Sequence, residues 1–323
     1  MERNLAGEAG QHVLRVQQKT WEADGITSVT LVDPSGAALP TWKPGAHLAL
    51  HLPNGLVREY SLCSDPHDST KWTVAVLRTA DSRGGSSYIH DSLPVGAHIS
   101  VEGPRNAFHL EDGPKHFLIA GGIGITPILP MVRELEARGA EWSLLYTGRS
   151  RQTMAFLPAV DQLPRERRHV HVDDESGRYP DLKAMLHSQD PRTLVYCCGP
   201  TPLMDAVAEG MEDPSLLRLE RFKAPERELP PGTVDEAFDV VLNSTGERIP
   251  VGPDESVLEA LEAAGVDVPS SCAEGICGTC ETTVLSGEVD HRDFLLTPEE
   301  HEAAGTMMVC VSRCRGRELV LEL

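Results

Sequence analysis

The sequence contains no run of 18 apolar residues, so no part of it is expected to cross a membrane as a helix. Its first eight residues lack the basic and then apolar stretch of a secretion signal, so we expect a cytoplasmic protein. Basic residues are also scarce, because 29 Lys and Arg stand against 49 Asp and Glu, for a net charge of −20. Nucleic acid is therefore not expected as a partner, since its phosphates would be repelled.

The acidic residues are concentrated in the last quarter of the chain. Residues 237–323 hold 17 Asp and Glu against 5 Lys and Arg, so they carry −12 of the total charge. One interpretation is a solvated surface that keeps the protein soluble. The other is a docking face for a basic partner, which would raise the encounter rate. The sequence alone leaves both open.

A chain of 323 residues has room for two or three domains, each with its own core. Residues 1–111 contain short β segments separated by turns, which predict a small antiparallel β-barrel. Strands and helices alternate in residues 112–224 and predict a doubly wound parallel α/β sheet. Residues 225–236 are polar and rich in proline, as in a linker. Residues 237–323 predict a small mixed sheet crossed by one helix, which fits a β-grasp domain.

Four of the eight cysteines form a pattern that carries chemistry. Cys272, Cys277 and Cys280 have C-x4-C-x2-C spacing, and Cys310 follows further on. This is the ligand spacing of a plant-type 2Fe-2S cluster, which needs soft thiolate ligands. A chain with such a cluster moves single electrons. The loop also contains two glycines that would let it wrap tightly around a cluster, Gly275 and Gly278.

Two alternatives for the cysteines compete with this prediction. A structural zinc ion could be held by Cys277, Cys280, Cys310 and Cys314, but this leaves Cys272 idle and needs an unusually long gap. Cys314 could also replace Cys310 as the fourth cluster ligand, although we favour Cys310. A disulfide framework is not expected in a cytoplasmic protein.

Three turns in the predicted parallel sheet follow the carboxyl ends of strands, where such sheets bind ligands. The glycine-rich turn at residues 121–127 leads into a helix and could hold a pyrophosphate, although Pro127 breaks the full G-x-G-x-x-G fingerprint. The turns at residues 148–151 and 198–200 could hold an adenosine ribose and a nicotinamide. Together they predict a nicotinamide dinucleotide site made by Gly122, Gly124, Thr126, Pro127, Gly148, Arg149, Ser150, Asp173, Cys198, Gly199, Pro200 and Met204.

Two stretches of the predicted barrel could bind a flavin. In the first, Arg58 could hold a phosphate, Tyr60 could pack along the ring and Ser61 could hydrogen-bond a ring atom. The second, at residues 83–87, precedes a predicted helix whose backbone N–H groups could approach a phosphate. Taken alone, each stretch could equally be an ordinary edge strand or a flexible turn.

With these stretches in view, the chain resembles the phthalate dioxygenase reductase family over nearly its whole length and in the same domain order. The resemblance implies an FMN-binding domain at residues 1–111, an NAD(P)H-binding domain at residues 112–224 and a plant-type 2Fe-2S ferredoxin domain at residues 237–323. The motifs that carry it are Arg58-x-Tyr60-Ser61-Leu62-Cys63, Arg83-Gly84-Gly85-Ser86, residues 121–127, residues 195–200, Pro269-Ser270-Ser271-Cys272, Asp290-His291-Arg292-Asp293 and residues 309–313.

Family members pair FMN, a nicotinamide cofactor and a 2Fe-2S centre, and the ferredoxin domain in last place favours FMN over FAD. The resemblance also implies that the aromatic ring of Phe222 stacks on the flavin. Glu59 departs from the family pattern, since a small threonine is common there. The implied FMN site consists of Arg58, Glu59, Tyr60, Ser61, Val76, Leu77, Gly84, Gly85, Ser86, Thr126 and Phe222.

The resemblance implies an NAD(P)H-dependent oxidoreductase that passes electrons through FMN to the cluster and on to a terminal oxygenase. No side chain is required to act as an acid or base, because the cofactors supply the chemistry. The sequence shows no Cys-x-His pair and no pattern of two histidines with one carboxylate, so we expect the oxygenase to be elsewhere. A Rieske-type oxygenase is preferred to a P450 as partner, docking near the acidic ferredoxin domain, and the reductase is expected to be a monomer.

Three alternatives stay open at this point. The chain could be the reductase unit of a P450 system, or a redox sensor that uses the cluster as a switch. The nicotinamide cofactor could be NADH, towards which the resemblance leans, or NADPH, because Arg149 and Arg151 could hold a 2′-phosphate.

Overall fold

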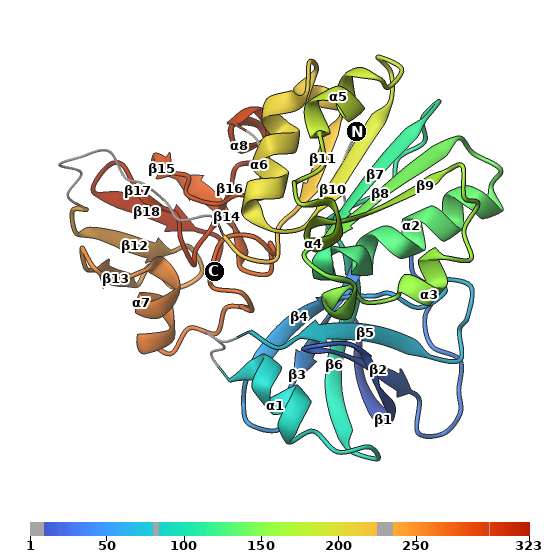
Figure 1. Ribbon diagram of the computed structural model, residues 1–323. Helices are drawn as coiled ribbons and strands as arrows, with labels where there is room; N and C mark the ends of the chain where they lie inside the picture. The colour runs from blue at the N-terminus through green and yellow to red at the C-terminus, as the bar shows by residue number, and fades with distance from the viewer. Residues whose placement is uncertain (1–9, 80–83, 225–234, 297) are drawn as a thin grey trace. The chain divides into compact units, whose positions relative to one another are not determined.

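The protein forms two compact units that divide between Arg221 and Phe222 in a computed structural model. None of the helices among the described residues is both long and apolar enough to cross a membrane. The structure describes residues 10–79, 84–224, 235–296 and 298–323 (Figure 1).

The first part of unit one is a six-stranded antiparallel sheet that curls into a barrel. The edge strands β4 and β5 meet through a bridge between Leu62 and Val74, which closes the sheet. Alternate side chains, such as Leu14, Leu48 and Trp72, point inward and are fully buried. The predicted antiparallel barrel is confirmed. Its strands, in the order β4-β3-β6-β1-β2-β5, are β1 (Gln11–Ala23), β2 (Ile26–Val32), β3 (Ala46–His51), β4 (Val57–Ser61), β5 (Trp72–Leu77) and β6 (His98–Asn106), and helix α1 (Gly85–Asp91) lies between β5 and β6.

The second part of unit one is a five-stranded parallel sheet in the order β11-β10-β7-β8-β9. The central strand, β7, is apolar on both faces. Leu118 packs in the hydrophobic cluster that includes residues of α2, and Phe117 packs in the cluster that includes residues of α5 and α6. Figure 1 shows α2 on one face of the sheet and α5 and α6 on the other. Helices on both faces confirm the predicted doubly wound α/β arrangement. The elements are β7 (His116–Gly121), α2 (Ile125–Ala137), β8 (Trp142–Gly148), α3 (Leu157–Val160), β9 (Arg168–Val172), α4 (Asp173–Ser176), α5 (Leu182–His187), β10 (Leu194–Cys198), α6 (Thr201–Gly210) and β11 (Leu217–Glu220).

Unit two is built around a mixed sheet in the order β13-β12-β18-β14-β16, with β12 and β18 parallel. Helix α7 packs on it through Val257, Leu258 and Leu261, and it begins with a capping box between Ser256 and Glu259. This is the β-grasp arrangement that the sequence predicts. The elements are β12 (Phe238–Leu242), β13 (Arg248–Val251), α7 (Val257–Ala263), β14 (Glu281–Ser286), β15 (Val289–Asp290), α8 (Pro298–Ala304), β16 (Thr306–Met308), β17 (Arg313–Cys314) and β18 (Glu318–Leu321).

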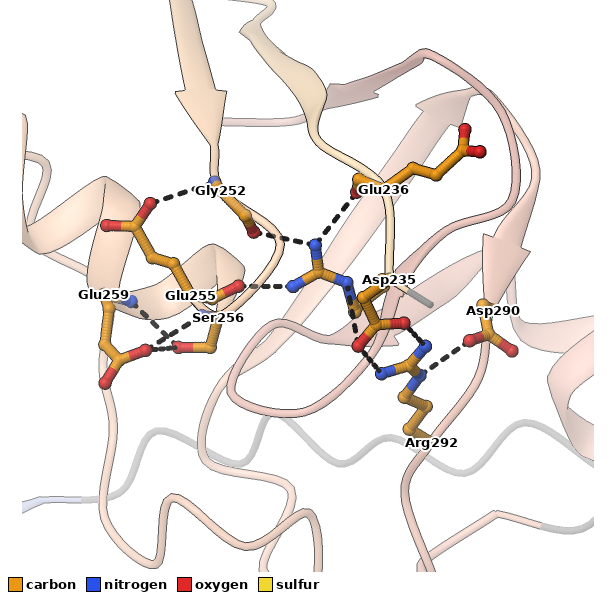
Figure 2. Close-up of polar contacts among 9 residues, drawn as sticks. Asp235, Glu236, Gly252, Glu255, Ser256, Glu259, Asp290 and Arg292 are labelled. Atoms are coloured by element: carbon orange, nitrogen blue, oxygen red, sulfur yellow. Dashed lines mark hydrogen bonds and ion pairs between the residues drawn. The ribbon is translucent and has the colours of Figure 1, made fainter. Parts of the chain in front are cut away.

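Two arginines, Arg292 and Arg313, hold residues 235 and 236, just before β12, against other segments of unit two (Figure 2). Arg292 donates from Nη1 to Asp235 Oδ2 at 2.8 Å and from Nε to Asp290 Oδ2 at 2.6 Å. The guanidinium of Arg313, 5% exposed as a residue, donates to the carbonyls of Glu236 and Gly252 at 3.1 and 2.8 Å. These charge-assisted bonds hold residues 235 and 236 against the segments on either side of the cluster loop.

Candidate cofactor sites

The structure gathers the four cysteines of the predicted cluster into one loop region of unit two. The thiol of Cys272 contacts those of Cys277 and Cys310, and the thiol of Cys280 contacts that of Cys310. These contacts lower the pKa of Cys272 and raise that of Cys310, as expected for thiols in direct contact that share a proton. Cys314 points to other partners, the Glu318 carbonyl at 3.5 Å and the Gly316 N–H at 3.2 Å. The donor set therefore fits a 2Fe-2S cluster held by four thiolates.

The backbone of the cluster loop adopts left-handed conformations that few residues tolerate. Gly275 and Gly278 have φ of 70° and 77°, and Ala273 has φ of 54°. A Cβ on Gly275 would also lie 2.6 Å from a methyl group of Val311. The loop can therefore wrap closely, and the N–H of Glu274 comes within 3.3 Å of the Cys272 sulfur. Such N–H···S bonds tune cluster potentials.

The predicted FMN residues of the barrel lie on β4, on β5 and at the start of α1. Gly85 has no room for a side chain, because a Cβ there would lie 2.6 Å from Cγ of Arg58. The glycine thus lets the arginine lie against the N-terminal end of α1, where a phosphate could be held by both. Ser61 and Ser86 are buried, and burial raises the pKa of Tyr60 to about 12, so its hydroxyl stays protonated.

The other predicted flavin residues are placed less uniformly. Val76 is fully buried, whereas Leu77 is 37% exposed and could face a ligand. Thr126 is buried and donates its hydroxyl hydrogen to the Ile123 carbonyl at 3.0 Å. Phe222 is the first residue of unit two and is 43% exposed, so its predicted place on the flavin stays a prediction. Arg83, part of the second motif, lies outside the described residues.

The turns after β7 and β10 pack so closely that only glycine fits. A Cβ on Gly124 would lie 2.1 Å from the carbonyl oxygen of Cys198, and one on Gly121 would lie 3.3 Å from Cα of Gly199. In contrast, a Cβ on Gly122, with φ of 53°, would meet no atom within 4 Å. The glycine-rich turn therefore packs against the end of β10 at Cys198 through Gly121 and Gly124. The space beside Gly122 is open and could accept a ligand.

The turn after β8 places the predicted ribose-binding residues beside an acidic helix. Arg149 is exposed, and its carbonyl accepts from the N–H of Asp174 at 3.0 Å. Arg151 forms a bidentate ion pair with Glu175, at 2.7 and 3.0 Å. The predicted Asp173 opens the same helix, α4, whose first turn carries three acidic residues. This turn is therefore more negative than the sequence suggested.

The remaining predicted nucleotide residues surround the ends of β8 and β10. Gly148 is in contact with Met154, whose Cγ lies 2.5 Å from where a Cβ would be, and Ser150 lies beyond it. Pro200 precedes α6, and Pro127 lies inside α2. Met204 is 2% exposed in the cluster beneath α6, so any part it plays in binding is by packing.

One residue that the sequence did not point to joins the two halves of unit one. Glu220, at the end of β11, pairs in register with Cys198 on β10. Its Oε2 accepts a hydrogen bond from the Ser61 hydroxyl at 3.3 Å and lies 3.9 Å from the Cys198 sulfur. The only signal in the sequence is a carboxylate at the end of a predicted strand, two residues before Phe222.

The electrostatics of this junction are unusual. Burial, with a smaller contribution from Glu59, raises the pKa of Glu220 to about 8, so the carboxyl is protonated at neutral pH. Burial and the neighbouring Glu220 raise the pKa of Cys198 well above its usual value, so this residue is an uncharged thiol. The junction therefore offers a proton-carrying carboxyl beside two small neutral side chains.

Comparison with protein families supports the assignment of both cofactor domains. Residues 118–209 match the oxidoreductase NAD-binding domain, and residues 240–315 match the 2Fe-2S iron-sulfur cluster binding domain. The chain is 42% identical over 308 residues to the toluene-4-sulfonate monooxygenase system reductase subunit of Comamonas testosteroni, covering 93% of this chain and 95% of that protein.

Solved structures show the same architecture. Phthalate dioxygenase reductase superposes with a TM-score of 0.72 at 37% identity, over 97% of this chain and 98% of that one. An intact type IV self-sufficient cytochrome P450 monooxygenase superposes with a TM-score of 0.88 at 43% identity, over 97% of this chain. The chain spans only 41% of that P450 polypeptide, so the similarity concerns one part of it.

Proposed function

The chain belongs to the phthalate dioxygenase reductase family of oxygenase reductases, and from this we propose that it carries electrons from NADH through FMN and a 2Fe-2S cluster to a terminal oxygenase. The observation that carries the proposal is the four-cysteine loop of unit two, together with a unit one whose glycine turns and Ser61–Glu220 junction suit a flavin and a dinucleotide. We assign FMN to residues 1–111, the dinucleotide to 112–224, a linker to 225–236 and the cluster to 237–323.

The proposed FMN site uses Arg58 and the start of α1 for the phosphate, with Tyr60, Ser61 and Leu77 along the ring. The proposed cluster ligands are the four cysteines 272, 277, 280 and 310. FMN held at this site would link the two-electron hydride chemistry of the nicotinamide to the single-electron chemistry of the cluster. The chain's own residues position these groups and handle the accompanying proton.

Glu220 is the residue best placed to handle that proton. Below about pH 8 its carboxyl holds a proton, while its Oε2 accepts a hydrogen bond from the Ser61 hydroxyl. A neutral carboxyl at this position also avoids placing a negative charge where electrons arrive. Cys198 is a neutral thiol, so we expect it to contact the bound cofactor as a small side chain and not to act as a nucleophile. This role differs from the expectation that no side chain takes part in proton transfer.

We propose NADH over NADPH because Arg151, one of the two arginines that could hold a 2′-phosphate, is already engaged. Arg151 is held by Glu175 in a bidentate ion pair, and the first turn of α4 adds two further carboxylates. A 2′-phosphate bound by Arg151 would have to displace the Glu175 carboxylate, and near either arginine it would be repelled by the neighbouring acids.

We further propose a Rieske-type oxygenase as the acceptor, docking on the acidic surface of unit two, with a monomeric reductase in the cytoplasm. Exposed carboxylates of this unit include Asp254, Glu259, Glu262 and Asp267, on or beside α7. A basic partner surface would be attracted to them. A P450 acceptor is the rival, given the similarity to one part of a self-sufficient P450.

A visible spectrum with cofactor extraction tests the core of this proposal. We expect a flavin band with iron–sulfur shoulders, FMN in the denatured supernatant, two irons per chain and rapid NADH-driven reduction of ferricyanide. Release of FAD would contradict the flavin assignment, and a holoprotein reduced only by dithionite would indicate a redox sensor. Separately supplied Rieske oxygenase and P450 acceptors then distinguish the two partner classes.

A further inference from the structure

Three metal-ligating side chains meet in unit two, away from the four cysteines. His291 and Asp293 lie on the segment after β15, and His301 lies on α8. One possible ligand atom from each falls within 4.8 Å of the others. We expected no set of two histidines with one carboxylate from the sequence, and the structure corrects this: the fold returns His301, eight residues beyond Asp293, to His291.

The geometry of these side chains suits a small divalent cation. Nε2 of His301 lies 2.9 Å from Oδ1 of Asp293, and the imidazole rings of His291 and His301 stack with centroids 4.0 Å apart and an interplanar angle of 15°. Around a tetrahedral zinc ion, with bonds of about 2.0–2.1 Å, ligand atoms lie about 3.3 Å apart. Rotation of the two imidazole rings out of their stacked arrangement would bring all three ligand atoms onto one ion.

The carboxylate is oriented before any ion binds. The side chain of Asp293 is 1% exposed, and its Oδ2 accepts from the N–H groups of Leu295 and Leu296 at 3.3 and 3.0 Å. This leaves Oδ1 facing His301. Backbone support for a ligating carboxylate is the arrangement that strengthens protein metal sites.

The segment that carries the group packs directly on the cluster loop. The N–H of Phe294 donates to the Gly275 carbonyl at 2.9 Å, and a Cβ on Gly275 would lie 3.1 Å from Cα of Asp293. An ion that ties this segment to α8 would therefore also fix the loop that holds the cysteines.

We propose that His291, Asp293 and His301 bind a divalent transition-metal ion, separate from the 2Fe-2S cluster, and that this ion fastens residues 291–296 against the cluster loop. Two imidazoles and one carboxylate favour zinc, with water completing the coordination. The purely structural alternative is a hydrogen-bonded group that binds no ion, and binding measurements separate the two.

The test uses purified holoprotein with its cluster intact. After equilibrium dialysis against micromolar zinc chloride, we expect about one zinc per chain, with the iron content unchanged. Asp293→Asn and His301→Gln should each weaken zinc binding by at least about tenfold, since each removes or weakens a ligand. His67→Gln is the matched control, because His67 also faces a carboxylate, that of Glu134 at 3.2 Å, but lies in unit one outside the proposed group.

A second control addresses the half-buried thiol of Cys314. Cys314→Ser should bind zinc as tightly as the wild type does. In a separate measurement, wild-type protein loaded with zinc should lose its cluster absorbance several-fold more slowly on mild heating than zinc-free wild-type protein. Equal zinc retention by wild type and His301→Gln would overturn the proposal, as would loss of binding in Cys314→Ser. If Asp293→Asn does not retain its cluster, the zinc affinities of His291→Gln and His301→Gln test the proposal instead. Both variants keep the hydrogen bonds from the Leu295 and Leu296 N–H groups to Asp293.

Discussion

The hydroxyl of Ser61, at the end of barrel strand β4, lies 3.3 Å from Oε2 of Glu220, at the end of β11 in the parallel sheet, although 159 residues separate them. This hydrogen bond joins the two halves of unit one at the point where both predicted cofactor sites converge. Its acceptor is a carboxyl that keeps its proton at neutral pH. The first prediction follows from that proton.

Glu220→Gln should remove the alkaline limb from the pH profile of flavin reduction by NADH. Because the pKa of Glu220 is raised from 4.5 to about 8, the wild-type rate should be steady below pH 7 and fall as pH rises through about 8, when the carboxyl loses its proton. The glutamine cannot ionise, so its profile should be flat. At pH 6.5 its rate should be lower by roughly 10²-fold, the smaller end of a general-acid contribution.

Stopped-flow reduction between pH 6 and 10 measures this profile directly. Glu209→Gln, an exposed residue near the end of α6, serves as the control and should keep the wild-type profile. An unchanged alkaline limb in Glu220→Gln would mean that another group titrates.

Glu175→Gln should improve the use of NADPH. The change frees Arg151 from its ion pair and removes one negative charge from the first turn of α4. A charge-assisted bond to a phosphate contributes about 1.5 kcal/mol or more, so kcat/KM for NADPH should rise about tenfold while that for NADH changes little. Steady-state kinetics with both cofactors measure the effect, with Glu166→Gln as a control of equal charge. A parallel change for both cofactors would argue against a 2′-phosphate role for Arg151.

Arg292→Met should destabilise unit two more than removal of an exposed arginine. The Arg292 side chain is 11% exposed and forms ion pairs with Asp235 and Asp290, so the change leaves two carboxylates without their main partner (Figure 2). We expect a loss of about 1–3 kcal/mol, which for a domain of this size lowers the melting temperature by several degrees. Loss of the cluster absorbance on heating reports it.

The control for this prediction is Arg248→Met. Arg248 is 59% exposed and its ion pairs with Asp239 at 3.4 Å and Glu318 at 2.5 Å lie on the surface, so its removal should cost less than about 1 kcal/mol. A double variant of Arg292→Met with Asp235→Asn tests the pairing itself. If the two single effects simply add, the proposed coupling between these residues is absent.

Reversing charge on the α7 side of unit two should slow electron transfer to a basic acceptor. Glu262 and Asp267 are exposed there, and neither is a proposed cluster ligand. With both changed to Lys, reduction of cytochrome c, a basic one-electron acceptor, should slow several-fold at low ionic strength and depend less on salt. Glu166→Lys with Glu209→Lys makes the same change in charge on unit one. Equal slowing in both double variants would indicate net charge and not a docking surface.

Local patterns in the sequence were enough to predict the fold classes and the 2Fe-2S cluster, whereas FMN was implied by the family resemblance. The spacing of Cys272, Cys277 and Cys280 is itself the ligand pattern of a 2Fe-2S cluster, and the period of the apolar residues distinguishes a parallel sheet from a barrel. These features depend on residues close together in the chain. The structure agrees with the barrel, the doubly wound sheet and the β-grasp unit for that reason.

Tertiary structure decided what each site can do. Ser61 meets Glu220 only because the ends of two strands from different sheets come together, and the burial that results raises the pKa of that carboxyl. Arg151 looked available for a 2′-phosphate until the turn after β9 placed Glu175 against it. His301 joins His291 across the fold. The charge and the pKa of a side chain depend on which groups lie near it in space, and these neighbours can be far away in the sequence.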